Sequence, residues 1–284
     1  MSLKSKLMMP MLGLSMLITL GSLVMLAVSM GNFAWLGAAL AAGALPVYMF
    51  AVMGRGEVAR TAASLPVVQL VAAVGLALAA WRVLSAGSPS SALSYLPLGL
   101  ALAGYLVMQW YVWVYSRYGR QTGVTIVIGQ NLPDVSFDRL DGGTLSISDL
   151  KGSKVLIVFF RGNWCPLCTA QLREVRDRAD TLASAGVQVK FVSNQSADLS
   201  RELAGQLDLP GHMEILVDTD LKAASELSIV DKGRTPPGMK GYPVDTVMAT
   251  VIALDAEGKV TFGDETDNYR VRPHPDSFMP ILAG

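Results

Sequence analysis

The sequence has few cysteines, few histidines and little charge, and each shortage excludes a class of protein. Only two of its 284 residues are Cys and two are His. Two cysteines that lie three positions apart cannot form a disulfide framework that holds a fold together. A reactive role therefore explains the pair better than a structural one. The formal net charge is +0, with 23 basic and 23 acidic residues. Nucleic-acid binding would favour a concentrated basic face, so we expect no nucleic-acid partner.

Charged residues make up 16% of the chain and its mean hydropathy is +0.41, which is too apolar for an average soluble protein. Residues 7–54 carry no charge and are divided by the turn-like pair Gly31-Asn32, and residues 61–81 and 95–116 are also uncharged. A helix needs about 20 residues to cross a bilayer. We therefore predict an all-α transmembrane four-helix bundle in residues 1–118, with the lipid bilayer as its partner.

A signal peptide is the alternative explanation of the first apolar run. Its apolar region would normally cover about 7–15 residues and be followed by a cleavage site and a soluble chain. Here a second apolar run follows directly. All four Cys and His residues come after position 160, so the spans lack the ligands for haem and the thiols for a transmembrane disulfide relay.

The charges that flank the spans predict their orientation, because short loops rich in Lys and Arg stay in the cytoplasm. One side of a four-span bundle would hold Lys4, Lys6, Arg55, Arg60, Arg117 and Arg120, and the other side only Arg82. This pattern predicts a multi-pass protein of a bacterial-type inner membrane, with the C-terminal domain in the cytoplasm. The aromatic residues at the end of the fourth span are expected to form an interfacial belt; they are Trp110, Tyr111, Trp113, Tyr115 and Tyr118.

The chain changes character after a linker that we place at residues 119–130. From Asn131 charges return, and short β-rich runs alternate with helical patterns, as is typical of an α/β sheet domain. The order of elements predicts a thioredoxin-like α/β fold in residues 131–284, with parallel pairing of its central strands. The expected strands are 135–137, 144–148, 155–160, 187–192, 214–217, 247–254 and 259–262, and the expected helices are 166–186, 200–207, 221–227 and 275–282.

The two cysteines form the motif Cys165-Pro166-Leu167-Cys168, which follows an apolar strand and begins a helix. Pro166 suits the first helical position, where its missing N–H is no loss. A helix N-terminus stabilises a thiolate, so Cys165 is predicted at the exposed start and Cys168 on the buried face, one turn away. The second thiol can then resolve a mixed disulfide or a sulfenic acid. Arg161 is expected to add positive potential and Trp164 to shield the site from water.

A C-x-x-C pair can also be half of a zinc site. The sequence has no second Cys pair, and His212 and His274 are isolated, so both histidines are interpreted as solvated loop residues. We expect no metal and no other cofactor.

The run Phe159-Phe-Arg-Gly-Asn-Trp-Cys-Pro-Leu-Cys168 closely resembles the peroxiredoxin-like branch of the AhpC/TSA family (alkyl hydroperoxide reductase/thiol-specific antioxidant) within the thioredoxin superfamily. Residues 141–152, 255–260 and 267–273 resemble the same family, so the resemblance covers about 131–282. It implies an antioxidant oxidoreductase that reduces peroxides or exchanges disulfides through Cys165 and Cys168. The implied partners are a peroxide or protein disulfide substrate and an electron donor, either thioredoxin-like or a low-molecular-weight thiol.

The resemblance leaves open which cysteine attacks first. On the peroxiredoxin pattern P-x-x-x-T-x-x-C, Cys168 takes the peroxidatic position, and Arg161 and Cys165 replace the proline and the threonine. On the thioredoxin pattern W-C-x-x-C, Cys165 attacks. The family's distal arginine would be Arg234 or Arg270. Met248-Ala249-Thr250 occupies the place of the thioredoxin cis-proline loop, and a peptide bond there is expected to be trans because proline is absent.

The sequence thus supports a membrane-anchored, thiol-dependent oxidoreductase, for which lipid peroxides would give the anchor a purpose. The alternative is a redox-sensing or binding module attached to a membrane partner, in which the cysteines respond to oxidation without turnover.

Overall fold

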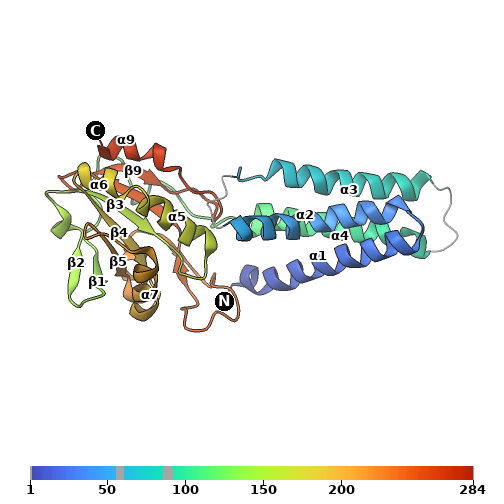
Figure 1. Cartoon of the computed structure of the whole chain (residues 1–284), viewed down its shortest axis with the longest axis horizontal. Coiled ribbons are helices and arrows are strands. Elements are labelled where there is room, and N and C mark those ends of the chain that lie inside the picture. The colour runs from blue at the N-terminus through green and yellow to red at the C-terminus, as the bar shows by residue number, and fades with distance from the viewer. Residues whose placement is uncertain (1, 56–60, 86–91, 284) are drawn as a thin grey trace. The chain divides into compact units, whose positions relative to one another are not determined.

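The computed structural model describes residues 2–55, 61–85 and 92–283, and the chain forms two compact units. The helical unit comprises Leu3–Arg55 and Thr61–Arg117, and the α/β unit contains the chain from Tyr118 onward (Figure 1). Residues 119–130, which we expected to be a linker, belong to the α/β unit. The side chain of Ile126 is buried there, and the Gly129 N–H donates to Val260 O.

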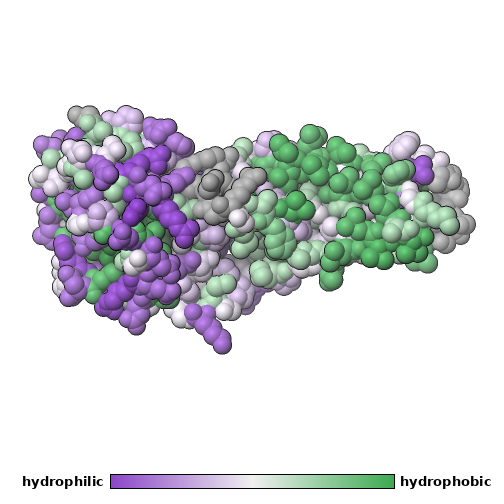
Figure 2. Space-filling model, in the orientation of Figure 1, coloured by the Kyte–Doolittle hydropathy of each residue, from purple (hydrophilic) through white to green (hydrophobic). Residues whose placement is uncertain are grey.

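Four helical stretches make up the described part of the helical unit, and each is long and apolar enough to cross a membrane; the fourth, Ala92–Tyr115, combines a 3-10 turn, an α-helix and a π-helical turn. They are α1 (Leu3–Val28), α2 (Phe33–Arg55), α3 (Pro66–Ser85) and α4 (Leu96–Trp110), and a π-helical turn at Tyr111–Tyr115 continues α4. These helices match the four uncharged runs. Figure 2 shows apolar side chains over much of the visible face of this unit. The Lys4 Nζ donates to Arg117 O at 3.3 Å, so the first helix begins where the last one ends.

Small residues let the backbones of these helices touch. A Cβ added to Gly75 on α3 would lie 2.5 Å from Ala41 N on α2, and one added to Gly37 would lie 2.6 Å from Gly75 O. Gly104 on α4 meets Ala42 in the same way, at 2.5 Å from its Cα. The small residues of the spans therefore serve packing within the bundle.

The α/β unit is built on a seven-stranded sheet of order β2-β1-β5-β4-β3-β8-β9. Its strands are β1 (Ser136–Arg139), β2 (Thr144–Ser146), β3 (Lys154–Phe159), β4 (Val187–Ser193), β5 (Met213–Val217), β8 (Thr250–Leu254) and β9 (Val260–Asp264), while β6 (Val230–Asp231) and β7 (Thr246–Val247) pair separately. The helices are α5 (Pro166–Arg176), α6 (Ala179–Ser184), α7 (Ala197–Leu207), α8 (Lys222–Glu226) and α9 (Met279–Ala283).

Strand β3 runs parallel to β4 and antiparallel to β8, and β4 runs parallel to β5. Val155 to Phe159 are at most 1% exposed, because neighbouring strands and layers cover both faces of this strand. A continuous apolar run is what such a strand requires. The predicted thioredoxin-like α/β architecture, with β3 leading into the cysteine motif, is confirmed.

The predicted single helix over 166–186 is wrong, because α5 ends at Arg176 and α6 begins at Ala179. Arg178 leaves the helical region with φ −104° and ψ 16°, and its N–H donates to Val175 O, three residues back. The apolar spacing continues through the break, since Val175 and Leu182 are both buried. Periodicity alone therefore did not reveal the interruption.

Other helix and strand boundaries also differ from the predicted ones. The strand expected at 247–254 is divided into β7 and β8, and Met248 and Ala249 lie outside the ladder. The last helix is preceded by a 3-10 turn at Pro275–Ser277. Helix α7 begins three residues earlier than expected, because the Ser196 side chain caps it by accepting from Leu199 N.

Candidate active site

The cysteine motif lies on the turn that joins β3 to α5. Gly162 has φ +134°, and a Cβ there would lie 2.9 Å from Trp164 Nε1, so only glycine fits both the backbone and the indole. Cys165 is the N-cap of α5 and Pro166 its first residue. The Cys168 N–H donates to Cys165 O at 2.9 Å, which closes the first turn with both sulfurs on it.

Both cysteines are free thiols in the structure, and both are buried. Cys165 is 3% exposed and Cys168 0%, so the prediction that Cys165 is exposed at the helix start is wrong. Charged groups from distant parts of the chain gather at this end of α5, among them the buried Arg272. The sequence did not show this, because Arg272 lies 107 positions from Cys165.

Two donors approach the sulfur of Cys168. The Arg161 backbone N–H and the Arg272 Nη2 each lie 3.5 Å from Cys168 Sγ. We expected Arg234 or Arg270 to be the distal arginine; the arginine found against the sulfur is Arg272, two residues beyond Arg270. The signal available was its place in the closing segment 267–273, which resembles the family.

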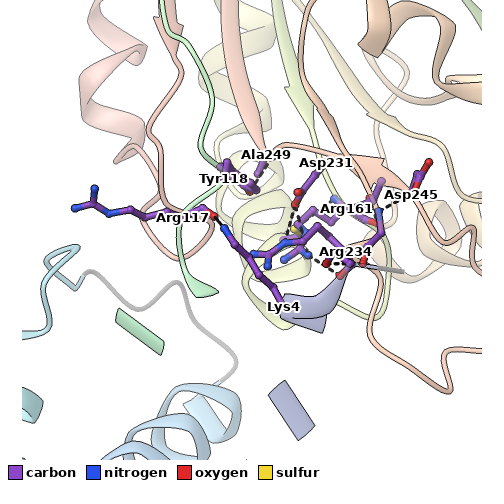
Figure 3. Close-up of polar contacts among 12 residues, drawn as sticks. Lys4, Arg117, Tyr118, Arg161, Asp231, Arg234, Asp245 and Ala249 are labelled. Atoms are coloured by element: carbon purple, nitrogen blue, oxygen red, sulfur yellow. Dashed lines mark hydrogen bonds and ion pairs between the residues drawn. The ribbon is translucent and has the colours of Figure 1, made fainter. Parts of the chain in front are cut away.

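The side chain of Arg161 is buried beside the motif. Its guanidinium carbon lies 4.7 Å from the centre of the Trp164 ring, and its Nη2 donates to Arg234 O at 3.1 Å. The same Nη2 is 4.0 Å from an oxygen of Asp231, which also lies 3.4 Å from Arg234 Nε (Figure 3). The structure therefore places Arg161 and Trp164 beside the cysteines. Asp231 and Arg234, which the sequence did not associate with Arg161, contact its guanidinium.

The two thiols differ in acidity. A hydrogen bond from the Cys168 thiol lowers the pKa of Cys165 to about 5; burial opposes this shift, and Arg161 and Arg272 add to it. Burial raises the pKa of Cys168 well above its usual range, as do its hydrogen bond to Cys165 and the charge there. Burial lowers the pKa of Arg161, but the coulombic effects of Tyr118, Cys165, Asp231 and Cys168 together raise it, so Arg161 stays charged. One proton is thus shared by the pair, with the negative charge on Cys165.

The segment that replaces the cis-proline loop also contacts the site. None of the described peptide bonds is cis, as expected for Met248-Ala249-Thr250. The Ala249 N–H donates to the Tyr118 hydroxyl at 3.1 Å (Figure 3), and Tyr118 also hydrogen-bonds the Arg272 side chain. Tyr118 was expected in an interfacial belt, and that expectation is wrong: its hydroxyl bonds within the α/β unit.

A buried glutamine holds the other side of the motif loop. Gln195 accepts from Asn163 N at 3.0 Å and donates to Asn163 Oδ1 at 2.8 Å and Ser200 Oγ at 3.2 Å. A cavity of about 820 Å³ opens beside Gln195, and it is lined mainly by residues that follow β4 and β5 and by residues 241–245. In the described part of the chain no three His, Cys, Asp or Glu residues gather as a metal site would require.

Comparisons with known proteins match this unit. Residues 128–262 match the model of the AhpC/TSA family. A putative peroxiredoxin bcp of Coxiella burnetii is 30% identical over 139 residues, covering 49% of this chain and 87% of that protein. The peroxiredoxin Bcp of Escherichia coli is 25% identical over 154 residues, covering 54% and 94%. The crystal structure of peroxidoxin BcpB from Mycobacterium tuberculosis superposes with a TM-score of 0.45 and 18% identity, covering 55% and 95%.

Proposed function

This chain belongs to the AhpC/TSA family and its α/β unit is a thiol peroxidase domain, and from this premise we propose a membrane-anchored dithiol peroxidase in which Cys165 attacks and Cys168 resolves. The observation that carries the proposal is the unequal pair of sulfurs on one helical turn. The sulfur with the lowered pKa is Cys165, and its neighbour is the donor that lowers it.

Three features favour Cys165 as the first nucleophile. A thiolate, not a thiol, attacks peroxide, and a pKa of about 5 keeps Cys165 ionised at neutral pH. Cys165 is the N-cap of α5, where the helix dipole stabilises negative charge. Cys165 also keeps 3% of its surface exposed to solvent, whereas Cys168 is fully buried.

The proposed reaction has two steps. The Cys165 thiolate attacks the terminal oxygen of the hydroperoxide; a sulfur–oxygen bond forms, the oxygen–oxygen bond breaks, and the alkoxide takes up a proton and leaves as the alcohol. Cys168 then gives up its proton and attacks the Cys165 sulfenic acid; the disulfide forms and the hydroxyl leaves as water. A thiol donor, thioredoxin-like or of low molecular weight, returns the disulfide to the dithiol.

The second step needs Cys168 to ionise although burial opposes it. The Arg161 N–H and the Arg272 guanidinium, each 3.5 Å from its sulfur, are placed to stabilise that charge. Because both sulfurs lie on one turn of α5, the disulfide can form without unwinding the helix.

The anchor completes the proposal. We place the four helices of the helical unit across an inner membrane, with the thiol domain on the cytoplasmic face, because the basic flanking residues then lie on the cytoplasmic side. A peroxidase held there is suited to lipid hydroperoxides that form in the bilayer.

Purified full-length protein in detergent tests the chemistry. With hydrogen peroxide and dithiothreitol, the wild type should consume peroxide, and one equivalent of peroxide alone should remove two hydrogens by mass as the disulfide forms. Cys168→Ser should accumulate a sulfenic acid on Cys165 that dimedone traps, and Cys165→Ser should lose activity. Equal turnover in both variants and the wild type would exclude thiol catalysis, and oxidation without turnover would favour a sensor.

Membrane topology needs a separate test, because the native cysteines are buried. In a protein with both cysteines changed to Ser, a Glu257→Cys variant reports on the α/β unit and an Asn32→Cys variant on the turn between α1 and α2; both positions are exposed. An impermeant maleimide added to spheroplasts should label position 32 and leave position 257 unlabelled until lysis. The reverse pattern contradicts the cytoplasmic assignment.

A further inference from the structure

Tyr118 begins the C-terminal segment that forms most of the α/β unit, and it directly follows Arg117, the last residue of the helical unit. Its hydroxyl accepts a hydrogen bond from Ala249 N at 3.1 Å (Figure 3). It is also hydrogen-bonded to the Arg272 side chain. Arg272 in turn lies 3.5 Å from the sulfur of Cys168. Two hydrogen bonds therefore connect this tyrosine to the resolving thiol.

The residues after Tyr118 fix its position. The backbone N–H groups of Gly119 and Arg120 both donate to Asp267 Oδ1, at 2.7 and 3.1 Å. The Arg120 Nη1 donates to Thr250 Oγ1 at 3.1 Å, next to Ala249. The segment that carries Tyr118 is thus held beside Asp267 and the first residue of β8.

The phenol oxygen has two acceptor positions, and Ala249 and Arg272 use both. An arginine side chain has many rotamers, so a fixed acceptor beside the guanidinium restricts the directions in which it can point. Burial raises the pKa of Tyr118, with Arg272 and Arg161 opposing, so the phenol stays neutral at ordinary pH. A neutral partner holds Arg272 without cancelling its charge, which a carboxylate at this place would do.

We propose that Tyr118 is a positioning residue that holds the Arg272 guanidinium against the sulfur of Cys168 for the resolving step. The inference rests on the proposed function and deepens it. It makes the second step depend on the residue that directly follows the helical unit in sequence. Arg272 also helps to lower the pKa of Cys165, but its hydrogen bond is to Cys168, so we expect Tyr118 to affect the second step more than the first.

Tyr118→Phe in the full-length protein removes only the hydroxyl. We expect disulfide formation after a single addition of peroxide to slow about tenfold, as for the loss of one bond to a charged group. The rate of sulfenic acid formation on Cys165 should stay within about twofold of the wild type, so more sulfenic acid is trapped by dimedone. The matched control is Tyr105→Phe, at a partly exposed tyrosine on α4, and it should change neither rate.

A double-mutant cycle separates positioning from a general loss of structure. If Tyr118 acts through Arg272, Tyr118→Phe should have little further effect in an Arg272→Gln background. Equal slowing in both backgrounds, or an unchanged disulfide rate in Tyr118→Phe, overturns the proposal. Slowing of both chemical steps together with a lower melting temperature would also overturn it, by showing a structural role.

The thiols can also be titrated without peroxide, by thiolate absorbance in the ultraviolet. Tyr118→Phe should shift the second titration, that of Cys168, to higher pH, and should shift the first, that of Cys165, by less. If the wild type fails to consume peroxide, the proposed function fails while this titration still decides the role of Tyr118. An unchanged second titration counts against Tyr118 even if the protein is an active peroxidase.

Discussion

Between the helices of the helical unit the closest contacts are made by glycine and alanine, whereas the α/β unit buries four arginines. Ala38, Ala41, Ala79 and Ala101 are fully buried in the first unit. Arg161, Arg234, Arg270 and Arg272 are at most 7% exposed in the second. Buried charge is costly without partners, and two of these arginines face the cysteines. The comparison indicates that one unit was shaped by close packing and the other by the chemistry of two sulfurs.

The acidity of Cys165 gives the largest expected effect. With a pKa of about 5 for Cys165, its thiolate fraction at pH 6 is about 300 times that of an ordinary thiol of pKa about 8.5. The rate of alkylation of Cys165 by iodoacetamide, followed by peptide mass, should be nearly level from pH 6.5 to 8 and fall below pH 5 (about tenfold per unit). A rate that keeps rising through pH 8 would show that neither the hydrogen bond from Cys168 nor the arginines lower the pKa of Cys165.

Packing in the helical unit should be sensitive where the backbones touch. Gly75→Leu places a side chain where a Cβ would already lie 2.5 Å from Ala41 N. We expect the bundle to lose about 3 kcal/mol or more, because overpacking a close contact forces the backbones apart. Thermal unfolding in detergent, followed by circular dichroism, measures this loss.

Gly21→Leu on α1 is the matched control, since no atom lies within 4 Å of an added Cβ there. It should leave the melting temperature close to that of the wild type. The alkylation profile of Cys165 should be unchanged in both variants. A shifted alkylation profile in Gly75→Leu would show that packing in the helical unit controls the thiols. It would contradict the view that the two units are shaped separately.

Arg272→Gln removes the charge next to Cys168. Loss of a hydrogen bond to a charged group costs about 1.5–3 kcal/mol, so the resolving step should slow by about 10- to 100-fold. Disulfide formation after a single addition of peroxide measures the effect. Arg139→Gln, at a partly exposed arginine that pairs with Glu214 at 3.5 Å, is the control and should have no effect. Equal rates for the two variants would remove Arg272 from the mechanism.

The smallest expected effect tests the bond between the thiols. Cys168→Ala removes the hydrogen bond that contributes most to the low pKa of Cys165, so that pKa should rise by about one unit or more. Cys168→Ser keeps a hydroxyl donor and should raise it less. The alkylation profile of Cys165 reports both values. If Cys168→Ala, Cys168→Ser and the wild type gave identical alkylation profiles, the low pKa of Cys165 would be due to the arginines alone.

Much of the fold could be predicted from the sequence because its signals are local. Uncharged runs of about 20 residues identify the four helices. The apolar run 155–160 identifies the central strand, and the glycine turn at 141–143 identifies the first hairpin. The place of Cys165 and Pro166 at the start of a helix follows from the same kind of signal.

The surroundings of the sulfurs could not be predicted in this way. Arg272 and Tyr118 lie 104 and 50 positions from Cys168 in sequence, and the only signal was the resemblance of residues 267–273, which include Arg272, to the family. Tyr118 follows a run of aromatic residues and therefore resembled a membrane anchor. The burial of Cys165 was missed for the same reason, because long-range packing determines it.

The burial of Cys165 limits the size of the reactant that can reach its sulfur, and this affects the oxidation and the reduction of the thiols differently. Hydrogen peroxide is hardly larger than water and can reach a sulfur that is 3% exposed, as can the –OOH group of a lipid hydroperoxide. A protein reductant must instead bring its own sulfur into line with the disulfide, which such a small opening does not allow. We therefore expect reduction by a protein donor to require local opening of the chain, so that the supply of electrons, rather than of oxidant, sets the pace of turnover.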